Sequence, residues 1–201
     1  HENVFVSVFG AQVILVVLFT LLFFGLLYGN LTVADRLAPP IRPPGPEEDL
    51  LRGYHLAVGH RRGLVRLVLS GLFAVIAGLG VSGRWQEWLL FTNAVDFGTT
   101  DAQFGRDLGF YVFRLPFMSF VIGWLFASLI IVLVLTTIFH YINGGIRLQS
   151  VGERVQPQVK AHLSVLLGLV ALVRAGDYWL ARFELTTSNR GAVVGASYTD
   201  V

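Results

Sequence analysis

The chain has 201 residues, of which 54% are hydrophobic and only 14% charged, and its formal net charge is +2. Soluble domains carry roughly 25% charged residues, so this composition excludes an ordinary water-soluble fold. The small net charge gives no reason to expect nucleic-acid binding, and a chain without cysteine has no disulfide or thiolate metal site.

Four long apolar runs follow one another along the chain. A helix of about 20 apolar residues crosses the hydrocarbon core of a bilayer, because a backbone in lipid must satisfy its own hydrogen bonds. The first and third runs contain no charge, the second has Arg66 near its start, and the fourth contains Arg174 and Asp177. We therefore predict an all-α, polytopic transmembrane helix bundle with spans at about residues 8–33, 64–82, 117–141 and 161–183.

The connecting segments divide their basic residues unevenly. Residues 34–63 hold five arginines, and residues 142–160 add Arg147, Arg154 and Lys160. The outer loop, residues 83–116, has three arginines against four acidic residues. The positive-inside rule then places 34–63 and 142–160 in the cytoplasm, and 83–116 and the segment 184–201 outside. Both ends of this chain are expected to be extracytoplasmic.

The two longer loops carry signs of local structure. In the inner loop, five prolines between residues 39 and 46 are followed by Glu47, Glu48 and Asp49, which predicts a stiff stretch and then an amphipathic helix at the interface. An SH3-type partner is the alternative use of the prolines. In the outer loop, Trp85 and Trp88 have helical spacing and suit the headgroup layer. Pro116 is placed as the first helical residue of the third span.

Small residues recur at a spacing of four on two of the spans. Such faces let membrane helices approach closely, although glycine is also common in membrane helices generally. We predict helix-packing faces at Ser70, Ala74, Gly78 and Ser82 on the second span and at Gly25 and Gly29 on the first.

Arg174 and Asp177 stand three residues apart within the fourth span. Charges in a membrane are costly and usually pair with each other inside a bundle. One interpretation is an intramembrane proton or ion relay. The others are a structural ion pair, or a shifted helix in which Arg174 snorkels to the interface.

The remaining polar residues give weaker indications. Asp96, Asp101 and Asp107 could hold calcium, but their spacing matches no EF-hand and aspartate is ordinary in turns and caps. His140 and His162 lie near the cytoplasmic ends of their spans, where haem or metal ligation is conceivable, yet neither belongs to a metal motif. Gly144 and Gly145 indicate a helix stop. No catalytic residue, metal site or cofactor is predicted.

Three segments in this order resemble the bacterial uncharacterised protein family 0182. They are Asp101-Ala-Gln-Phe-Gly-Arg-Asp107 with the aromatic run to Phe117, then His140-Tyr-Ile-Asn-Gly-Gly-Ile-Arg147, then Tyr178-Trp-Leu-Ala-Arg-Phe-Glu-Leu185 with Gly195-Ala-Ser-Tyr-Thr-Asp200. The resemblance implies a multi-pass protein of the bacterial cell (inner) membrane with a large extracytoplasmic domain. This chain would be an internal piece of its membrane part, and the family supplies no activity to carry over.

The leading interpretation is a non-enzymatic membrane scaffold that anchors the extracytoplasmic domain. Besides the lipid bilayer, its expected partners are a second copy or envelope proteins, and the missing parts of its own polypeptide, which Asp101 and Asp107 would contact. The alternative is a transporter or channel that uses Arg174 and Asp177. A weaker alternative is a membrane enzyme acting on a lipid-linked substrate through the outer-loop aspartates.

Overall fold

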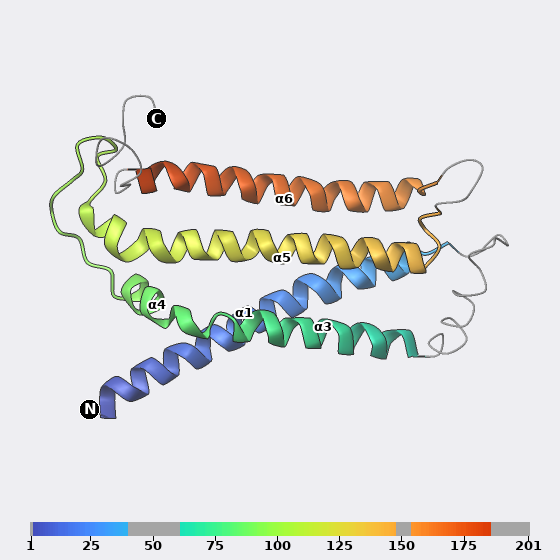
Figure 1. Ribbon diagram of the computed structural model, residues 1–201, viewed down its shortest axis with the longest axis horizontal. Coiled ribbons are helices and arrows are strands. Elements are labelled where there is room, and N and C mark those ends of the chain that lie inside the picture. The colour runs from blue at the N-terminus through green and yellow to red at the C-terminus, as the bar shows by residue number, and fades with distance from the viewer. Residues whose placement is uncertain (1, 40–60, 148–153, 186–201) are drawn as a thin grey trace. The chain divides into compact units, whose positions relative to one another are not determined.

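The computed structural model describes residues 2–39, 61–147 and 154–185, and within these the chain is helical (Figure 1). Only two isolated bridges, Thr100–Asp107 and Ile146–Val155, pair extended backbone in the described part. The helices are α1 (Glu2–Arg36), α3 (Arg62–Leu79), a 3₁₀ turn (Ser82–Arg84), α4 (Trp85–Thr92), a π-helical turn (Phe110–Arg114), α5 (Leu115–Ile142) and α6 (Pro157–Glu184).

Four helical segments are long and apolar enough to cross a membrane, as the hydropathy pattern predicted. They are Ser7–Arg36, Arg62–Thr92, Phe110–Ile142 and Pro157–Glu184. The all-α fold class with four such helices is therefore confirmed. The proline run and the amphipathic helix expected within 34–63 lie almost wholly at 40–60, outside the described residues.

The third apolar helix begins earlier than Pro116. Pro116 has no N–H, so it cannot donate the usual hydrogen bond to the carbonyl four residues before it. A wide π-helical turn precedes it instead, in which the N–H of Leu115 donates to the carbonyl of Phe110. The aromatic run from Phe110 is thus continuous with α5, and Pro116 is the second residue of that helix.

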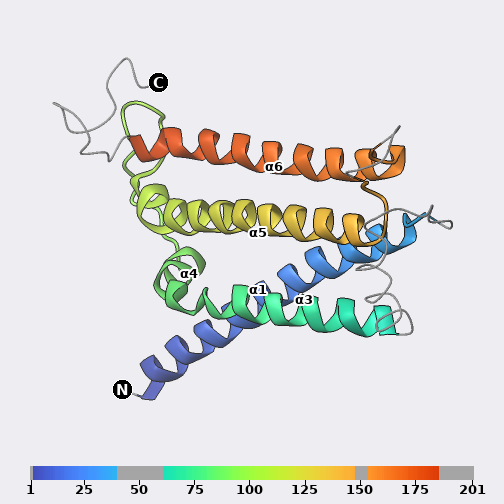
Figure 2. The same ribbon diagram turned by 45° about the vertical axis from the view of Figure 1, so that its right-hand side comes forward.

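The chain folds as two compact units. One contains residues 17–79 and 128–169, and the other contains residues 1–16, 80–127 and 170–201. Helices α5 and α6 lie side by side within each unit (Figures 1 and 2). In the second unit the hydroxyl of Ser119 donates to Glu184 at 2.6 Å, and in the first His140 and His162 meet at 3.0 Å.

Helix α1 buries one narrow stripe. Its buried side chains recur every four residues from Ala11 to Leu31, through Leu15, Phe19, Phe23 and Leu27. Positions four apart lie on one side of a helix, so this stripe is a single packing face. The other sides of α1 are also apolar, which suits a helix surrounded by lipid.

Helix α5 ends at the predicted glycines. Gly144 has a φ of +78°, a left-handed conformation that favours glycine. The N–H of Gly145 donates to the carbonyl of His140 at 2.9 Å, and that of Gly144 to Tyr141 at 3.0 Å. These two bonds define a Schellman cap, so the predicted helix stop is confirmed.

Candidate functional site

Residues 95–110 form a tight loop that precedes α5 in the sequence. The N–H of Asp101 donates to the carbonyl of Arg106 at 2.8 Å, and the N–H of Leu108 donates to Thr99 at 2.9 Å. Gly98 and Gly105 supply the positive φ values of 72° and 63° that the turns need. The loop is therefore held by its own backbone as well as by its side chains.

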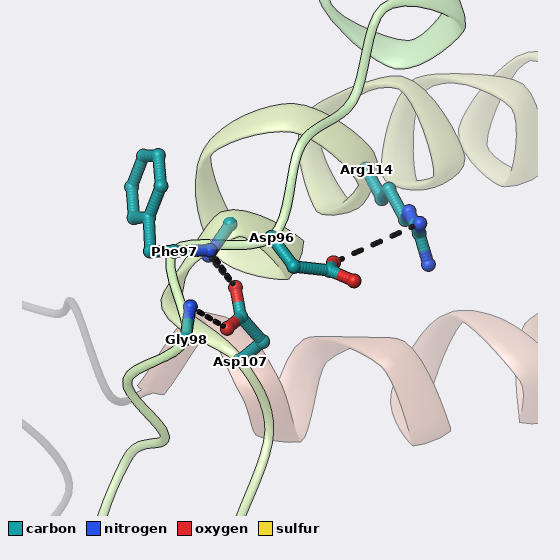
Figure 3. Close-up of polar contacts among 6 residues, drawn as sticks. Asp96, Phe97, Gly98, Asp107 and Arg114 are labelled. Atoms are coloured by element: carbon teal, nitrogen blue, oxygen red, sulfur yellow. Dashed lines mark hydrogen bonds and ion pairs between the residues drawn. The ribbon is translucent and has the colours of Figure 1, made fainter.

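Asp107 binds the backbone of this loop with both carboxylate oxygens. Oδ1 accepts a hydrogen bond from the N–H of Phe97 at 2.9 Å, and Oδ2 accepts one from the N–H of Gly98 at 2.8 Å (Figure 3). Oδ1 also accepts a hydrogen bond from the N–H of Gly109 at 2.7 Å. The neighbouring Asp96 lies 3.9 Å from Arg114, also in Figure 3, with both side chains at least half exposed. Such an exposed pair contributes little to stability.

Asp101 plays the same part a few residues earlier. Its Oδ1 accepts from the N–H of Arg106 at 2.8 Å, and its Oδ2 accepts from the N–H of Phe104 at 3.0 Å. The hydroxyl of Tyr111 donates to Oδ2 at 2.9 Å and ties the carboxylate to the π-helical turn. The two aspartates of the sequence motif thus anchor the two halves of one loop.

These hydrogen bonds keep both carboxylates ionised. Burial raises the pKa of Asp101, but the hydrogen bonds from Phe104, Arg106 and Tyr111 outweigh it and hold that pKa below its usual value. The pKa of Asp107 is also lowered, chiefly by the hydrogen bond from the N–H of Phe97. Oxygens that already accept N–H donors are poorly placed to bind calcium or to deliver a proton.

An aromatic cluster fixes the loop to the end of α6. Phe183 is only 1% exposed, and it forms a small core with Leu115 and Leu180. The ring of Phe104 lies 5.0 Å from the Phe183 ring between centroids, and that of Phe110 lies 5.3 Å away, both edge to face. Such pairs contribute about 0.5–1.5 kcal/mol each beyond the burial of area.

The structure brings Arg174 and Asp177 together on α6. Nη1 of Arg174 donates to Oδ2 of Asp177, and the guanidinium lies 5.4 Å from the ring centroid of Phe126 on α5. It also lies 4.5 Å from the ring of Tyr178. The two charged side chains remain 46% and 30% exposed, so this pair lies at the surface of its unit. Whether it moves ions stays a prediction.

The small residues of α3 lie on its buried side, whereas those of α1 do not. Ser70, Ala74 and Gly78 are buried, and Ser82 is partly exposed in the 3₁₀ turn. Gly25 and Gly29 both lie on the exposed side of α1, and a Cβ added to either would meet no atom within 4 Å. The buried face of α1 among the described residues is the stripe of larger side chains, and the glycine packing face at Gly25 and Gly29 stays a prediction.

Three polar side chains from three helices form a chain of hydrogen bonds that the sequence did not predict. Nε2 of His162 lies 3.0 Å from Oδ1 of Asn30, and Nδ1 of His162 lies 3.0 Å from Nε2 of His140. Nearby on the same unit, Arg66 of α3 donates to Asp35 of α1 at 2.7 Å. The only sequence signal was the position of both histidines near the same ends of their spans, and Asn30 gave none.

No group of three metal-ligating side chains is found in the described part of the chain. Among residues 2–39, 61–147 and 154–185, no three His, Cys, Asp or Glu side chains gather in a way that could hold an ion. Two polar sites stand out in these ranges: the loop at 95–110 held by Asp101 and Asp107, which we call the aspartate loop, and the hydrogen-bonded Asn30, His162 and His140, which we call the histidine chain.

Comparison with known proteins assigns the family. The model of the uncharacterised protein family UPF0182 matches residues 1–201. A UPF0182 protein of Frankia casuarinae is 43% identical over 100% of this chain and 20% of its own length. One from Thermobifida fusca is 44% identical over 84% of the chain and 16% of its own length, and one from Streptomyces coelicolor is 34% identical over 94% and 19%.

The chain thus spans about a fifth of the length of these relatives. No solved structure matches it. The match covers the three segments whose order first indicated the family, including the aspartate loop and the end of α5. The chain belongs to the uncharacterised protein family UPF0182.

Proposed function

We propose that this chain is a non-enzymatic integral membrane scaffold, in which the aspartate loop forms a rigid cap at the outer ends of α5 and α6. The observation that carries the proposal is the complete use of Asp101 and Asp107 within the loop. Each carboxylate accepts at least three hydrogen bonds from the loop and the adjoining π-helical turn. Polar groups arranged in this way fix a shape and leave little for chemistry.

The cap is suited to support the rest of the polypeptide. Its aromatic side is joined to α6 through Phe183, so the loop and the helix end form one cluster. A loop with fixed shape on a membrane helix gives an extracytoplasmic domain a defined surface to rest on. Because the relatives are about five times longer than this chain, such a domain is the first partner we propose. A second copy and envelope proteins are further proposed partners.

The rival functions receive less support from the same residues. A membrane enzyme would need an acid or base on the outer loop, but the lowered pKa values keep Asp101 and Asp107 ionised and occupied. A transporter that uses Arg174 and Asp177 would need them along a pathway. Here the pair is stacked against Phe126 and Tyr178 at the surface of its unit, as a structural ion pair would be.

The scaffold proposal is tested in the full-length protein with the double substitution Asp101→Ala and Asp107→Ala. We expect the helices to remain inserted in the membrane, while the extracytoplasmic region loses protease resistance and the assembly weakens. Unchanged protease resistance and assembly would reject the proposal.

Asp177→Ala separates the scaffold from the transporter. Normal folding with loss of solute or ion flux in proteoliposomes would favour the transporter. Loss of assembly alone would favour the scaffold. The readouts are the flux and the oligomeric state of the same purified sample.

A further inference from the structure

In the hydrogen bonds that connect Asn30, His162 and His140, the donor and acceptor of each bond can be assigned. The assignment starts from the backbone carbonyl of Leu26, which can only accept a hydrogen bond. The carbonyl of Leu26 receives Nδ2 of Asn30 at 2.7 Å, so this nitrogen is the amide NH₂ and the other atom is the oxygen. The oxygen faces Nε2 of His162 at 3.0 Å. An amide oxygen accepts, and therefore Nε2 of His162 carries a proton and donates it.

The same reasoning continues to the second histidine. A neutral imidazole has one N–H, so Nδ1 of His162 has a lone pair and accepts. Nε2 of His140, 3.0 Å away, must then be the donor. This leaves Nδ1 of His140 without a proton. These hydrogen bonds thus determine the tautomer of both histidines, and the last atom of the series, Nδ1 of His140, is unprotonated.

That nitrogen lies in the interior without a partner. His140 has an exposed fraction of 0%, and no described residue makes a hydrogen bond to its Nδ1. The Schellman turn brings Gly145 beside it, so that an added Cβ would lie 3.7 Å from Nδ1. A buried acceptor that stays unpaired destabilises the folded state. The basic nitrogen thus lies beside Gly145, and the side chain of Val159 fills the place where a Cβ of residue 145 would lie.

We propose that His140 and His162 form a proton-binding site within the helix bundle, which takes up one proton per chain at Nδ1 of His140. The added proton binds the lone pair of Nδ1 of His140. The two histidines together then change from neutral to a charge of +1, and neither is oxidised or reduced. The bond from Nε2 of His140 to His162 then becomes charge-assisted, a type roughly twice as strong as a neutral one.

The proton has a defined range of movement. It passes from Nε2 of His140 to Nδ1 of His162, whose own Nε2–H then donates a charge-assisted bond to Asn30. The amide oxygen of Asn30 is an acceptor but a very weak base, so transfer stops there. The two histidines therefore bind one proton, which can move between α5 and α6, but they do not form a continuous proton-conducting pathway.

Among the described residues, the other charged groups on the surrounding helices either pair with groups other than the two histidines or are exposed. Asp35 of α1 pairs with Arg66 of α3 at 2.7 Å, and Arg66 also lies 5.9 Å from the ring of Tyr28. Arg147 after α5 donates to the carbonyl of Gly144 at 3.4 Å, and Lys160 of α6 is exposed. The described residues also offer no third metal ligand beside the two rings, which favours a proton over a metal ion.

The first test compares the full-length wild type with His140→Gln in lipid nanodiscs. Glutamine can still donate an N–H toward His162, but it has no basic nitrogen, so the hydrogen-bonded chain is kept while the proton site is removed. We expect the variant to take up one proton fewer per chain as the pH falls from about 8 through and below the range in which ordinary histidine titrates. In ¹⁵N-histidine NMR spectra of the wild type, Nδ1 of His140 should gain a proton as the pH falls.

The second test, Asn30→Asp, keeps both histidines and places a carboxylate beside His162. An opposite charge at this distance should increase the proton affinity of the pair by about tenfold or more. The proposal is overturned by equal proton uptake in wild type and His140→Gln, or by an unchanged affinity in Asn30→Asp. It is also overturned if Nδ1 stays unprotonated at every pH at which the helices persist, or if its resonance shifts when a chelator is added, which would assign a metal site.

Discussion

Phe104 of the loop at 95–110 packs edge to face on Phe183 near the end of α6, with ring centroids 5.0 Å apart. The two residues are 79 positions apart in the sequence, and their contact joins the aspartate loop to α6, a helix long and apolar enough to cross a membrane. Phe104 also donates its N–H to Asp101. Phe104 therefore takes part both in the polar contacts that hold the loop together and in the aromatic contact that holds the loop against α6.

Phe183→Ala should detach the loop from α6. The substitution removes the centre of the aromatic cluster and leaves a cavity, which costs about 3–5 kcal/mol for a buried phenylalanine. The expected result is faster proteolysis of the loop and a lower melting temperature of the detergent-solubilised protein. Val165→Ala on the same helix is the control, because Val165 is 62% exposed. Equal effects of the two substitutions would contradict the assignment of Phe183 as a core residue.

The loop should loosen at acid pH because of its two aspartates. Both have a folded-state pKa below the usual value, so they bind protons less readily in the folded loop than in the unfolded chain. Their contribution to stability is fully present above about pH 4, the ordinary aspartate range, and it is lost as the pH falls through the lower folded pKa values. Amide exchange of Phe97 and Gly98 between pH 7 and pH 3 measures this change.

Asn is a poor replacement for either aspartate, and this gives the pH experiment its control. In Asp107, one oxygen accepts from Phe97 and Gly109 and the other accepts from Gly98. An asparagine would turn an NH₂ group toward one of these N–H donors. Asp107→Asn should therefore loosen the loop at pH 7 and weaken its acid response. An unchanged acid response would assign the transition to other groups.

The spans and the helix stop were predictable from sequence, because each follows from local chemistry. Apolar length identifies a membrane-crossing helix, and Gly144 can adopt a left-handed conformation that ends one. In α3, Ser70, Ala74 and Gly78 are buried, while Leu67, Leu72 and other large residues mark the exposed side. In α1 every side is apolar, so no periodicity could show whether Gly25 or Phe23 faces inward.

The polar sites depended on information that the sequence does not carry. The partners of Asp101 and Asp107 are mostly backbone N–H groups, which belong to every residue except proline and leave no pattern. Asn30 and His162 are 132 positions apart and meet only because two helices have a particular rotation and depth. Spacing could place both histidines near one end of their spans, but it could not place them in contact.

Gly109→Ala tests how tightly the loop is closed. A Cβ on Gly109 would lie 2.2 Å from the carbonyl oxygen of Val95 and 2.8 Å from Oδ1 of Asp107. Both are far closer than atoms can approach, and one of them is backbone, so the loop must open. We expect loss of the Asp107 hydrogen bonds and a large increase in amide exchange at Phe97. Gly123→Ala in α5 is the matched control, because its Cβ would meet nothing within 4 Å. Similar exchange in both variants would show that the loop is not packed this closely.

The ion pair between Arg66 and Asp35 should couple α3 to α1. Both side chains are mostly buried, at 15% and 22% exposure, and removing one leaves the other charge without its partner in a poorly hydrated place. In a double-mutant cycle of Asp35→Ala and Arg66→Ala, we expect each single substitution to destabilise the protein and the double substitution to cost less than their sum. The expected coupling is about 1–3 kcal/mol, measured by reversible unfolding in detergent.

The exposed pair Arg84 and Glu87 supplies the comparison for that cycle. Its side chains are 51% and 24% exposed and lie three residues apart around the start of α4, at 2.9 Å. Water screens such a pair, so its coupling should be about 0.5 kcal/mol or less. Equal coupling in the two cycles would mean that Arg66 and Asp35 are as well hydrated as a surface pair. A larger value for Arg66 and Asp35 would show that their contact contributes to holding α3 against α1.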